Sequence, residues 1–511
     1  MRDHTTLATA AVLPAFVLAL GFTGTARAVT VTINPAATHQ TIEAFGTMMK
    51  SDIGPGDSID VGVASYRDLL CNDLGLNIIR FWVPMTMEQS NDNADPNVLN
   101  AAGMNYNDPF LRFAIYIINQ LKTYPDMKFI AAVLSPPAWM KDNNNIANGK
   151  LLSTMREELA EYLVAYYRRI EAMTGVRLYG ISLQNESAFD EWYGSCNYTA
   201  TEYRDAFKVL GARFAAEGID IKLHGADDML GSVVRNPYFG TINADAVAKG
   251  YIDALSVHGY TNGIDPLPTS TAAADWTRFG NMARSMGKAA WMTEGSGWAQ
   301  TELIAPALHI GMALRYADLS MWVYLAPNIC SEYALMCNRA HTMVSAGHKH
   351  YYHWVRPGAV RIDATHTDSA LLVTAFHHPT NHTLSVVMVN TGTATKTVDL
   401  TGTGTPTTIR KFSSLAPSRM CRDDGDVSTT GVSIEANGVV TLYAESYNPP
   451  VGVAPRAATV RTATARAAGE QRWLLDGRRA GDATRQFTPA GVTVVRDARG
   501  ALRLTGIVAG R

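Results

Sequence analysis

Apolar runs of strand character recur through residues 42–325 and alternate with segments of helical period. Between residues 154 and 174, apolar side chains at 159, 163, 166, 170 and 173 share one helical face, and Gly175 follows as a stop signal. Eight strand–helix alternations favour an α/β fold with a closed (β/α)8 barrel over residues 41–360. A doubly wound open sheet is the alternative, but no Gly-x-Gly-x-x-Gly motif follows an early strand. The predicted strands are Ile42–Gly46, Leu76–Val83, Lys128–Ser135, Leu178–Glu186, Asp220–Ala226, Ile252–His258, Ala289–Glu294 and Leu319–Leu325.

The pattern changes after residue 361. Short strands separated by Gly, Asn, Pro and Ser turns replace the helical period, which predicts an antiparallel β module. Val29–Ile33 alternates in the same way, so residues 29–40 and 361–447 are assigned to one side domain. Residues 448–470 are expected to form a linker, and residues 471–511 a small β-rich C-terminal domain. The predicted strands of the side domain are Ala370–Phe376, Leu384–Val389, Thr397–Leu400, Thr408–Phe412 and Val439–Ala444.

Residues 1–28 have the features of an export signal. Arg2 precedes an apolar stretch from Leu7 to Phe22, and Ala26-Arg27-Ala28 is a small-x-small cleavage pattern. A membrane anchor is the alternative, but the apolar run is short for a spanning helix and Pro14 interrupts it. We therefore expect a secreted or cell-surface protein with no membrane span.

Composition and charge narrow the function classes. The chain has 511 residues, of which 47% are hydrophobic and 18% charged, so it can bury a core. The net charge of −2 gives no basic field for nucleic acid. That total hides an asymmetry, because residues 451–511 carry eleven arginines, no lysine and four acidic residues. The preceding body is therefore acidic, which argues against an anionic polymer as its main ligand.

The five cysteines have no zinc-binding spacing, and export permits disulfides. Cys330 and Cys337 are close enough in sequence to bridge a loop, whereas the other pairings stay open. His348, His350 and His353 lie on a predicted late helix, where half-exposed histidines are favoured over a metal site. We expect neither a metal nor a cofactor.

Two glutamates fall at predicted strand ends. Glu186 closes the fourth predicted strand and Glu294 the seventh. Functional groups of a parallel barrel project from the carboxyl ends of its strands, and strands 4 and 7 lie across the mouth from each other. Glycoside hydrolysis requires such a pair of carboxyl groups, with one ionised and the other protonated.

Five ordered motifs over residues 29–445 resemble glycoside hydrolase family 30. They are Gln40–Gly46, Ser135–Lys141, Ile181–Glu186, Trp291–Glu294 and Trp354–Ile362. The resemblance implies a retaining (β/α)8 hydrolase with a β-sandwich beside the barrel. It also implies that Glu186 is the general acid/base and that Glu294 is the nucleophile.

The same resemblance implies roles for further residues. Asn185 would bind the sugar 2-hydroxyl, and Arg80 would keep the nucleophile ionised. His258 and Tyr260 are expected to contact the substrate or to orient Glu294, with a structural histidine as the alternative for His258. The side chains expected to form sugar walls or subsites are Trp139, Trp322, Trp192, Tyr193 and Trp298, with core packing as the alternative for Trp139 and Trp322.

Departures from the family pattern bear on the substrate. Thr47 stands where a second Gly is usual, Ser187 replaces Pro, and Gly295 replaces an aromatic residue. Residues 324–330 lack the arginine of members that act on glucuronic-acid-decorated xylan. The absence of this arginine weakens a glucuronoxylan assignment and leaves plain xylan and β-1,6-linked polymers open. We favour a monomeric xylan-type endo-β-glycanase acting on a β-linked polysaccharide or oligosaccharide. The alternatives are a β-1,6-glucanase or β-1,6-galactanase, a glucosylceramidase-like exo-β-glycosidase, and a non-catalytic carbohydrate-binding surface protein.

The segment Trp473–Arg511 resembles the small C-terminal sorting domains of bacterial type IX secretion. The similarity rests on Asp476–Arg479 and Pro489–Arg496. It implies transit across an outer membrane, followed by surface attachment or release. A β-rich appendage without that role is the alternative.

Overall fold

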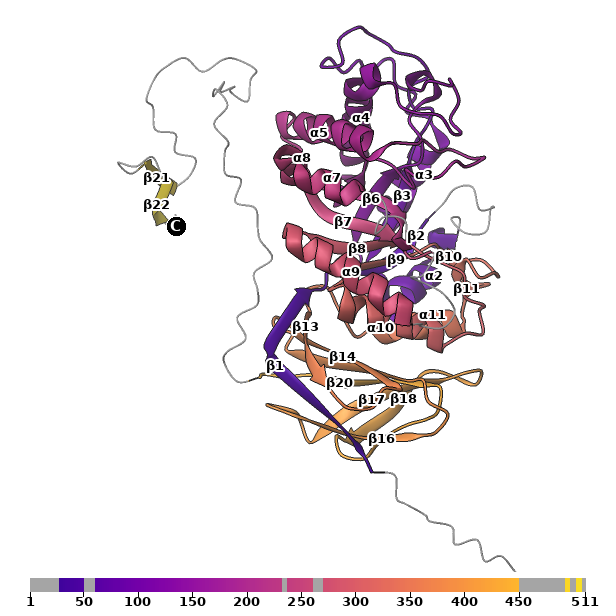
Figure 1. Cartoon of the computed structure of the whole chain (residues 1–511), viewed down its shortest axis with the longest axis vertical. Coiled ribbons are helices and arrows are strands. Elements are labelled where there is room, and N and C mark those ends of the chain that lie inside the picture. The colour runs from indigo at the N-terminus through magenta and orange to yellow at the C-terminus, as the bar shows by residue number, and fades with distance from the viewer. Residues whose placement is uncertain are drawn as a thin grey trace, which may run out of the picture. The chain divides into compact units, whose positions relative to one another are not determined.

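A computed structural model describes residues 27–49, 60–231, 237–260 and 270–449, together with 492–496 and 502–507. The chain divides into two compact units, residues 1–456 and 457–511 (Figure 1). The predicted export signal up to residue 26, the linker from residue 450 and most of the predicted C-terminal domain lie outside the described residues. Within the second unit, β21 (Val492–Arg496) and β22 (Leu502–Ile507) form an antiparallel pair.

Eight parallel strands close into a barrel in sequence order, which confirms the predicted α/β class. Strands buried on both faces are near-continuous apolar runs, as in Ile78–Val83, where Arg80 is the one charged residue. The barrel strands are β2 (Ala44–Met48), β3 (Ile78–Val83), β4 (Lys128–Val133), β5 (Gly180–Ser182), β6 (Lys222–Met229), β7 (Ile252–His258), β8 (Ala289–Glu294) and β9 (Met321–Tyr324).

Helices surround the barrel and bury its outer face (Figure 1). The predicted helix is α4 (Arg156–Thr174), which ends where Gly175 takes a φ of +70°, a left-handed conformation that glycine adopts without strain. The remaining helices are α2 (Ala64–Asp68), α3 (Pro109–Leu121), α5 (Ala200–Ala216), α7 (Tyr238–Ala244), α8 (Ala246–Tyr251), α9 (Ser270–Met286), α10 (Ile304–Tyr316) and α11 (Met343–Tyr352), with short turns η1 (Asp60–Gly62), η2 (Leu69–Asp73), η3 (Ala138–Met140) and η4 (Ser153–Met155).

The amino-terminal end of the barrel is closed by a polar network around Glu43. Its carboxylate accepts hydrogen bonds from Trp291 Nε1 at 3.0 Å and Ser320 Oγ at 2.8 Å, and Lys222 Nζ lies 2.7 Å away. Burial raises the pKa of Glu43, but Lys222 outweighs it and lowers that pKa below its ordinary value. Such networks at this end of a barrel serve stability.

A nine-stranded sheet packs beside the barrel in the order β18-β17-β20-β15-β14-β13-β1-β16-β19 (Figure 1). Its two halves share one apolar core, so the sheet forms the expected sandwich. In this sheet β1 and β16 form the parallel pair, and the other neighbouring strands pair antiparallel. The bounds are β1 (Val29–Thr41), β13 (Val360–Thr365), β14 (Leu371–His378), β15 (Thr383–Asn390), β16 (Lys396–Gly402), β17 (Thr408–Leu415), β18 (Arg419–Ser428), β19 (Val432–Ile434) and β20 (Gly438–Ala444).

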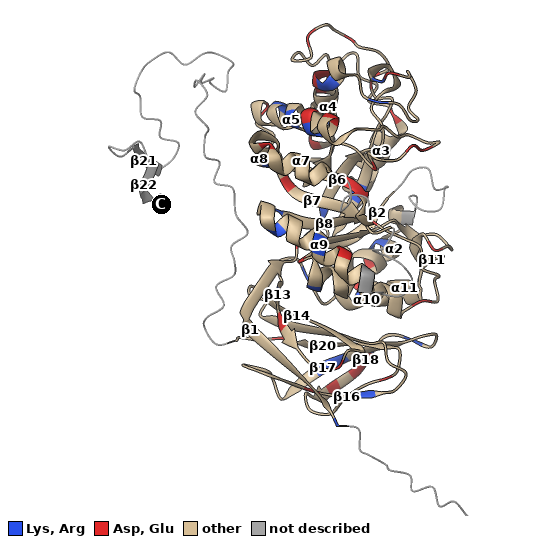
Figure 2. Cartoon of the chain, viewed as in Figure 1, with Lys and Arg blue, Asp and Glu red and all other residues tan. Residues whose placement is uncertain are grey.

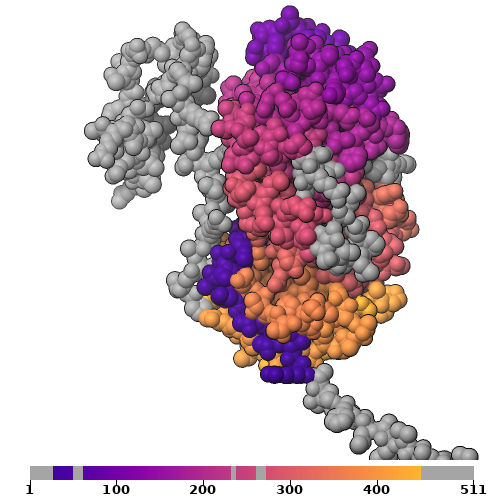
Figure 3. Space-filling model, in the orientation of Figure 1, coloured from indigo at the N-terminus to yellow at the C-terminus, as the bar shows by residue number. Residues whose placement is uncertain are grey.

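Strand β1 ties the sandwich to the barrel. Its first half pairs with β16 and its second half with β13, and β2 of the barrel follows after two residues. Figure 3 shows this indigo segment on the surface beside both parts. The expected participation of Val29–Ile33 in the side domain is confirmed, whereas β13, β18 and β19 were absent from the predicted strands.

A small sheet of β10 (Ala326–Asn328), β11 (Ala334–Cys337) and β12 (Ala340–His341) follows the last barrel strand. The expected bridge between Cys330 and Cys337 is present, and Cys71, Cys196 and Cys421 are free thiols. Among the described residues, no helix has both the length and the apolar character needed to cross a bilayer.

The expected half-exposure of the α11 histidines is wrong for His348 and His350, which are fully buried. Helix α11 lies between barrel and sandwich, so His350 bonds Thr441 at 2.7 Å and Ser414 at 2.8 Å. Burial lowers the pKa of His348 to about 4 and that of His350 to about 3, so both stay neutral packing groups.

Candidate active site

The structure brings the two predicted glutamates together at the carboxyl ends of the barrel strands. Glu186 follows β5 and Glu294 is the last residue of β8; the two are 5% and 7% exposed. Three atoms, namely one carboxylate oxygen of Glu186, one of Glu294 and a ring nitrogen of His258, all lie within 4.8 Å of one another. Retaining glycosidases separate their carboxyl groups by about 5–5.5 Å and inverting ones by about 6.5–9.5 Å. The spacing here is that of a retaining site.

Arg80, on β3, is fully buried and orients the carboxylate of Glu294. Its Nη1 donates to Glu294 Oε2 at 2.6 Å, and its Nη2 donates to Asn185 Oδ1 at 2.8 Å. A buried cation this close favours the ionised form of a carboxyl group. The same cation opposes a metal ion between Glu186, His258 and Glu294, although their spacing alone would allow one.

Asp227 is a buried site residue that the sequence analysis missed. It lies 3.3 Å from Arg80 Nη2, accepts a hydrogen bond from Thr293 Oγ1 at 2.6 Å, and its backbone oxygen accepts the N–H of Glu186 at 2.8 Å. Burial raises the pKa of Asp227, but the charges of His224 and Arg80 outweigh it and hold that pKa well below its usual range. The ionised carboxylate of Asp227 therefore forms an ion pair with Arg80 and helps to hold its guanidinium group in place.

The signal for Asp227 was present in the sequence. The predicted fifth strand ends at Ala226, whereas β6 runs to Met229. Asp227 and Asp228 are therefore among the last three residues of the strand. Had the strand been extended by one residue, the rule that located Glu186 and Glu294 would have located Asp227.

His258 and Tyr260 lie at the end of β7 against the two glutamates. His258 Nδ1 is 2.7 Å from Glu186 Oε1, so this histidine contacts Glu186, while Tyr260 donates to Glu294 Oε1 at 3.3 Å. Burial lowers the pKa of His258, but Glu294 and Glu186 outweigh it and raise that pKa above its ordinary value. Burial and the charge of Glu294 raise the pKa of Tyr260, which keeps its hydroxyl a donor.

Three expected sugar-contacting aromatics retain accessible surface. Trp192 is 88% exposed and meets Tyr193 edge to face at 5.5 Å. Burial and then the charge of Glu186 raise the pKa of Tyr193. Trp139, in η3, is half-buried, and its Nε1 donates to the backbone oxygen of Glu88 at 3.1 Å.

Trp298 and Trp322 differ from the expected sugar walls because neither has exposed surface. Trp322 lies on the outward-facing register of β9 and packs against Trp276 of α9. Trp298 stacks on Trp322 and on Tyr324, with interplanar angles of 6° and 11°. These two indoles therefore pack in the core around β9 and present no ring face to a ligand.

Beneath Trp139, buried carboxyl groups of the loop before α3 and of α4 lie close together. Burial, followed by the charge of Glu158, raises the pKa of Glu161 to about 8. Burial, followed by the charge of Asp92, raises the pKa of Glu88 to about 7. Both groups are therefore protonated in the folded protein at pH 5 to 6.

From this cluster of carboxyl groups we predict that the free energy of unfolding decreases as the pH rises. The unfolded chain releases these protons near pH 4.5, whereas the folded chain holds them up to pH 7 to 8, so stability is full at low pH and declines above it. We expect Tm to fall by about 3 °C or more between pH 5 and pH 8. In Glu161→Gln the fall is smaller, and in Glu157→Gln, on the exposed face of α4, it is unchanged. A parent Tm that rises over this range would contradict the assignment.

A closed (β/α)8 barrel with two carboxyl groups this close at its strand ends defines the class of retaining glycoside hydrolases. Two family models match the chain, the Glycosyl hydrolase family 30 TIM-barrel domain over residues 72–289 and the family 30 beta sandwich domain over residues 358–442. The chain belongs to glycoside hydrolase family 30. It is thus an O-glycosyl hydrolase with a carbohydrate substrate, which excludes the non-catalytic alternative.

Solved structures share this fold. A family 30 subfamily 8 xylanase of Clostridium acetobutylicum matches with a TM-score of 0.65 and 22% identity, over 81% of this chain and 99% of that chain. A conserved exported protein of Bacteroides fragilis matches with a TM-score of 0.69 and 14% identity, over 81% and 100%. An endo-β1,6-glucanase matches with a TM-score of 0.63 and 18% identity, over 82% and 93%.

Two proteins of Caenorhabditis elegans are similar in sequence. The first, named as a candidate glucosylceramidase, is 26% identical over 421 residues, which is 72% of this chain and 77% of that protein. The second carries a corresponding name and is 24% identical over 382 residues, 65% of this chain and 70% of that protein.

Proposed function

We propose that the chain cleaves a β-linked glycan by double displacement, with Glu294 as nucleophile and Glu186 as general acid/base. The observation that carries the proposal is the spacing of the two carboxyl groups within 4.8 Å, with Arg80 bonded to Glu294 at 2.6 Å. Because Arg80 neutralises one member of the pair, that member is the one suited to remain ionised and attack.

In the first step, a Glu294 oxygen attacks the anomeric carbon while Glu186 donates a proton to the departing glycosidic oxygen. Glu186 is then ionised and removes a proton from the water that attacks the glycosyl–Glu294 ester. That second attack releases Glu294 and restores the β-configuration, because two inversions at one carbon cancel. Asn185 directly precedes Glu186, and its Oδ1 accepts a hydrogen bond from Arg80 at 2.8 Å, so we assign its NH2 group to the sugar 2-hydroxyl.

For the substrate we favour an uncharged β-1,4-xylan main chain. The acidic body and the absence of arginine from residues 324–330 disfavour anionic side groups. The similarity in fold to a xylanase supports the choice. The similarity to an endo-β1,6-glucanase makes β-1,6-glucan the second candidate. Export, proposed from residues 1–28, would bring the enzyme to such polymers outside the cell.

Product analysis tests this proposal. Wild-type protein is incubated with β-1,4-xylan, β-1,6-glucan, β-1,6-galactan and glucosylceramide, and the first product is followed by proton NMR. We expect β-1,4-linked oligosaccharides from xylan, formed first as the β-anomer. Initial formation of the α-anomer would contradict double displacement, whereas cleavage of another polymer alone would replace the xylan assignment.

A further inference from the structure

A pocket lies where the sandwich meets the end of α11, away from the two glutamates. We call it the junction pocket; its volume is about 600 Å³, and the lining residues used here are Trp354, Thr408, Arg410, Phe412, Tyr443 and Glu445. A smaller pocket of about 420 Å³, lined in part by Arg356 and Asn381, shares Tyr443 and Glu445 with it. The two hollows therefore adjoin along one sheet face.

The register of the sheet explains why this pocket is open. Thr441 and Ser414 bond His350, so α11 covers this part of the face. Beyond it, Phe412 is opposite Thr441 and packs against Trp354, with ring centroids 4.4 Å apart. Two pairs further along, and so on the same face, Tyr443 is opposite Arg410, past the end of the helix, where nothing in the described residues covers it.

The junction pocket is on the side of the barrel opposite the active site. His353, which lines it, bonds the backbone oxygen of Asp73 at 2.8 Å. Arg356, which lines the adjoining pocket, donates to the oxygen of Gly75 at 2.7 Å. Asp73 and Gly75 precede β3 and therefore belong to the amino-terminal end of the barrel, whereas Glu186 and Glu294 lie at the carboxyl ends of the strands.

The lining favours a polar ligand without net charge. Figure 2 shows both signs of charge on β17 and β18, and Arg410 is already paired with Asp423 at 2.6 Å and with Asp426 at 3.4 Å. The carboxylate of Glu445 has no hydrogen-bond or ion-pair partner among the described residues. It can therefore accept from ligand hydroxyl groups, while the rings of Phe412 and Tyr443, both half-buried, offer apolar faces.

We propose that the junction pocket is a second carbohydrate-binding site, which holds a pyranose chain against Phe412 and Tyr443. The C–H faces of a pyranose ring suit aromatic side chains, and its hydroxyl groups suit Glu445. The volume lies within the range of about 300–1,000 Å³ of small-molecule sites, enough for a short oligosaccharide. The site tethers the enzyme to polymer without occupying the catalytic mouth.

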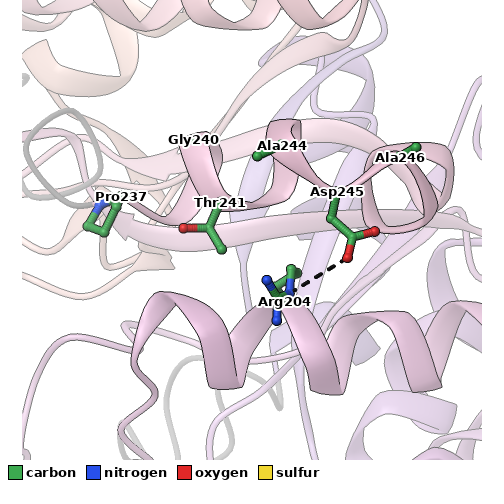
Figure 4. A pocket seen from close by; sticks show the side chains of 7 residues that line it. All are labelled: Arg204, Pro237, Gly240, Thr241, Ala244, Asp245 and Ala246. Carbon is green, nitrogen blue, oxygen red and sulfur yellow. Dashed lines mark ion pairs between the residues drawn. The ribbon is translucent and has the colours of Figure 1, made fainter.

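A hollow of equal volume elsewhere lacks these features. Lined by residues of α5, α7 and α8, it also measures about 600 Å³ (Figure 4). Its charged groups, Arg204 and Asp245, are paired with each other at 3.8 Å, and no aromatic residue lines it. Volume alone therefore does not single out the junction pocket.

Binding by the full-length Glu294→Gln protein, which keeps its substrate sites but lacks the proposed nucleophile, tests the inference. Sedimentation with insoluble β-1,4-xylan and affinity electrophoresis in β-1,6-glucan and β-1,6-galactan measure Kd. Adding Thr408→Arg, which fills the pocket from an exposed position, or Phe412→Ala is expected to raise Kd at least about tenfold on the glycan bound. The matched control is Thr367→Arg, at an exposed threonine of the sandwich outside the pocket, and it leaves Kd unchanged.

In the wild-type background, the same pocket variants are expected to leave kcat/KM on a small aryl β-glycoside unchanged. Unchanged Kd in both Thr408→Arg and Phe412→Ala overturns the proposal, and so does a parent protein that binds none of the three glycans. The proposed catalytic function is judged separately by wild-type hydrolysis, so failure of one proposal is distinguishable from failure of the other.

Discussion

Glu294→Gln is expected to lower kcat on the glycan that wild type cleaves by on the order of 10⁴-fold or more, as loss of a covalent nucleophile does elsewhere. An amide oxygen is too weak a nucleophile to form the glycosyl–enzyme ester. The substitution keeps the shape of the side chain, and its amide oxygen can still accept from Arg80, so the fold and KM are expected to change little. Initial rates on purified, folded protein check the result.

The control for Glu294→Gln is Glu157→Gln, which makes the same chemical change on the exposed face of α4. It is expected to retain full activity. Circular dichroism and Tm of both variants show whether the buried Arg80 is still accommodated. If the Glu294 variant retains more than a few per cent of the activity, another group is the nucleophile.

Glu186→Ala is expected to produce a different pattern of loss. Removing a general acid costs about 10²- to 10⁴-fold, and the cost depends on how much help the departing oxygen needs. Hydrolysis of the polysaccharide is therefore expected to fall by the larger factor. Dinitrophenyl glycosides, whose leaving group departs unprotonated, should still form the glycosyl–enzyme ester.

Azide then distinguishes the acid/base from the nucleophile. In Glu186→Ala a small anion fits the space that the carboxylate occupied and attacks the ester, so azide is expected to restore turnover and to give the β-glycosyl azide. Glu294→Gln is expected to show no such rescue, because it forms no ester. An α-glycosyl azide from the Glu186 variant, or rescue of the Glu294 variant, would reverse or remove the assigned roles.

The barrel could be predicted from sequence because parallel strands buried on both faces are short apolar runs, and each run is followed by a helical period. Glu186 and Glu294 stood out for the same reason, since a carboxylate at the end of such a run has no packing role. The sandwich was predicted less completely. Residues 419–428 form β18 although half of them are exposed, none is fully buried and several are charged, so the apolar alternation that marks a strand is missing.

Positions set by tertiary packing were beyond the sequence. Trp322 and Trp298 have the composition of a sugar platform, but strand register turns Trp322 outward and Trp298 stacks on it. The buried surroundings of His348 and His350 depend on the sandwich, whose strands lie far along the chain from α11. A local sequence pattern does not indicate which helix will be buried by a sheet formed much later in the chain.

The pairing of β1 has a consequence for the order in which the molecule is assembled. Thr32 meets Thr401, a separation of 369 residues, so the first strand to be synthesised is among the last to acquire both of its partners. Loop closure of this length is slow compared with the local βα units, and domains generally fold as units as they emerge. The barrel is therefore expected to form while β1, which precedes β2, is still unpaired. The edges of β13 and β16 then have no partner until β1 inserts between them. An amino-terminal segment held elsewhere, as a chain in transit is held, would delay this last step and keep the sandwich incomplete until release.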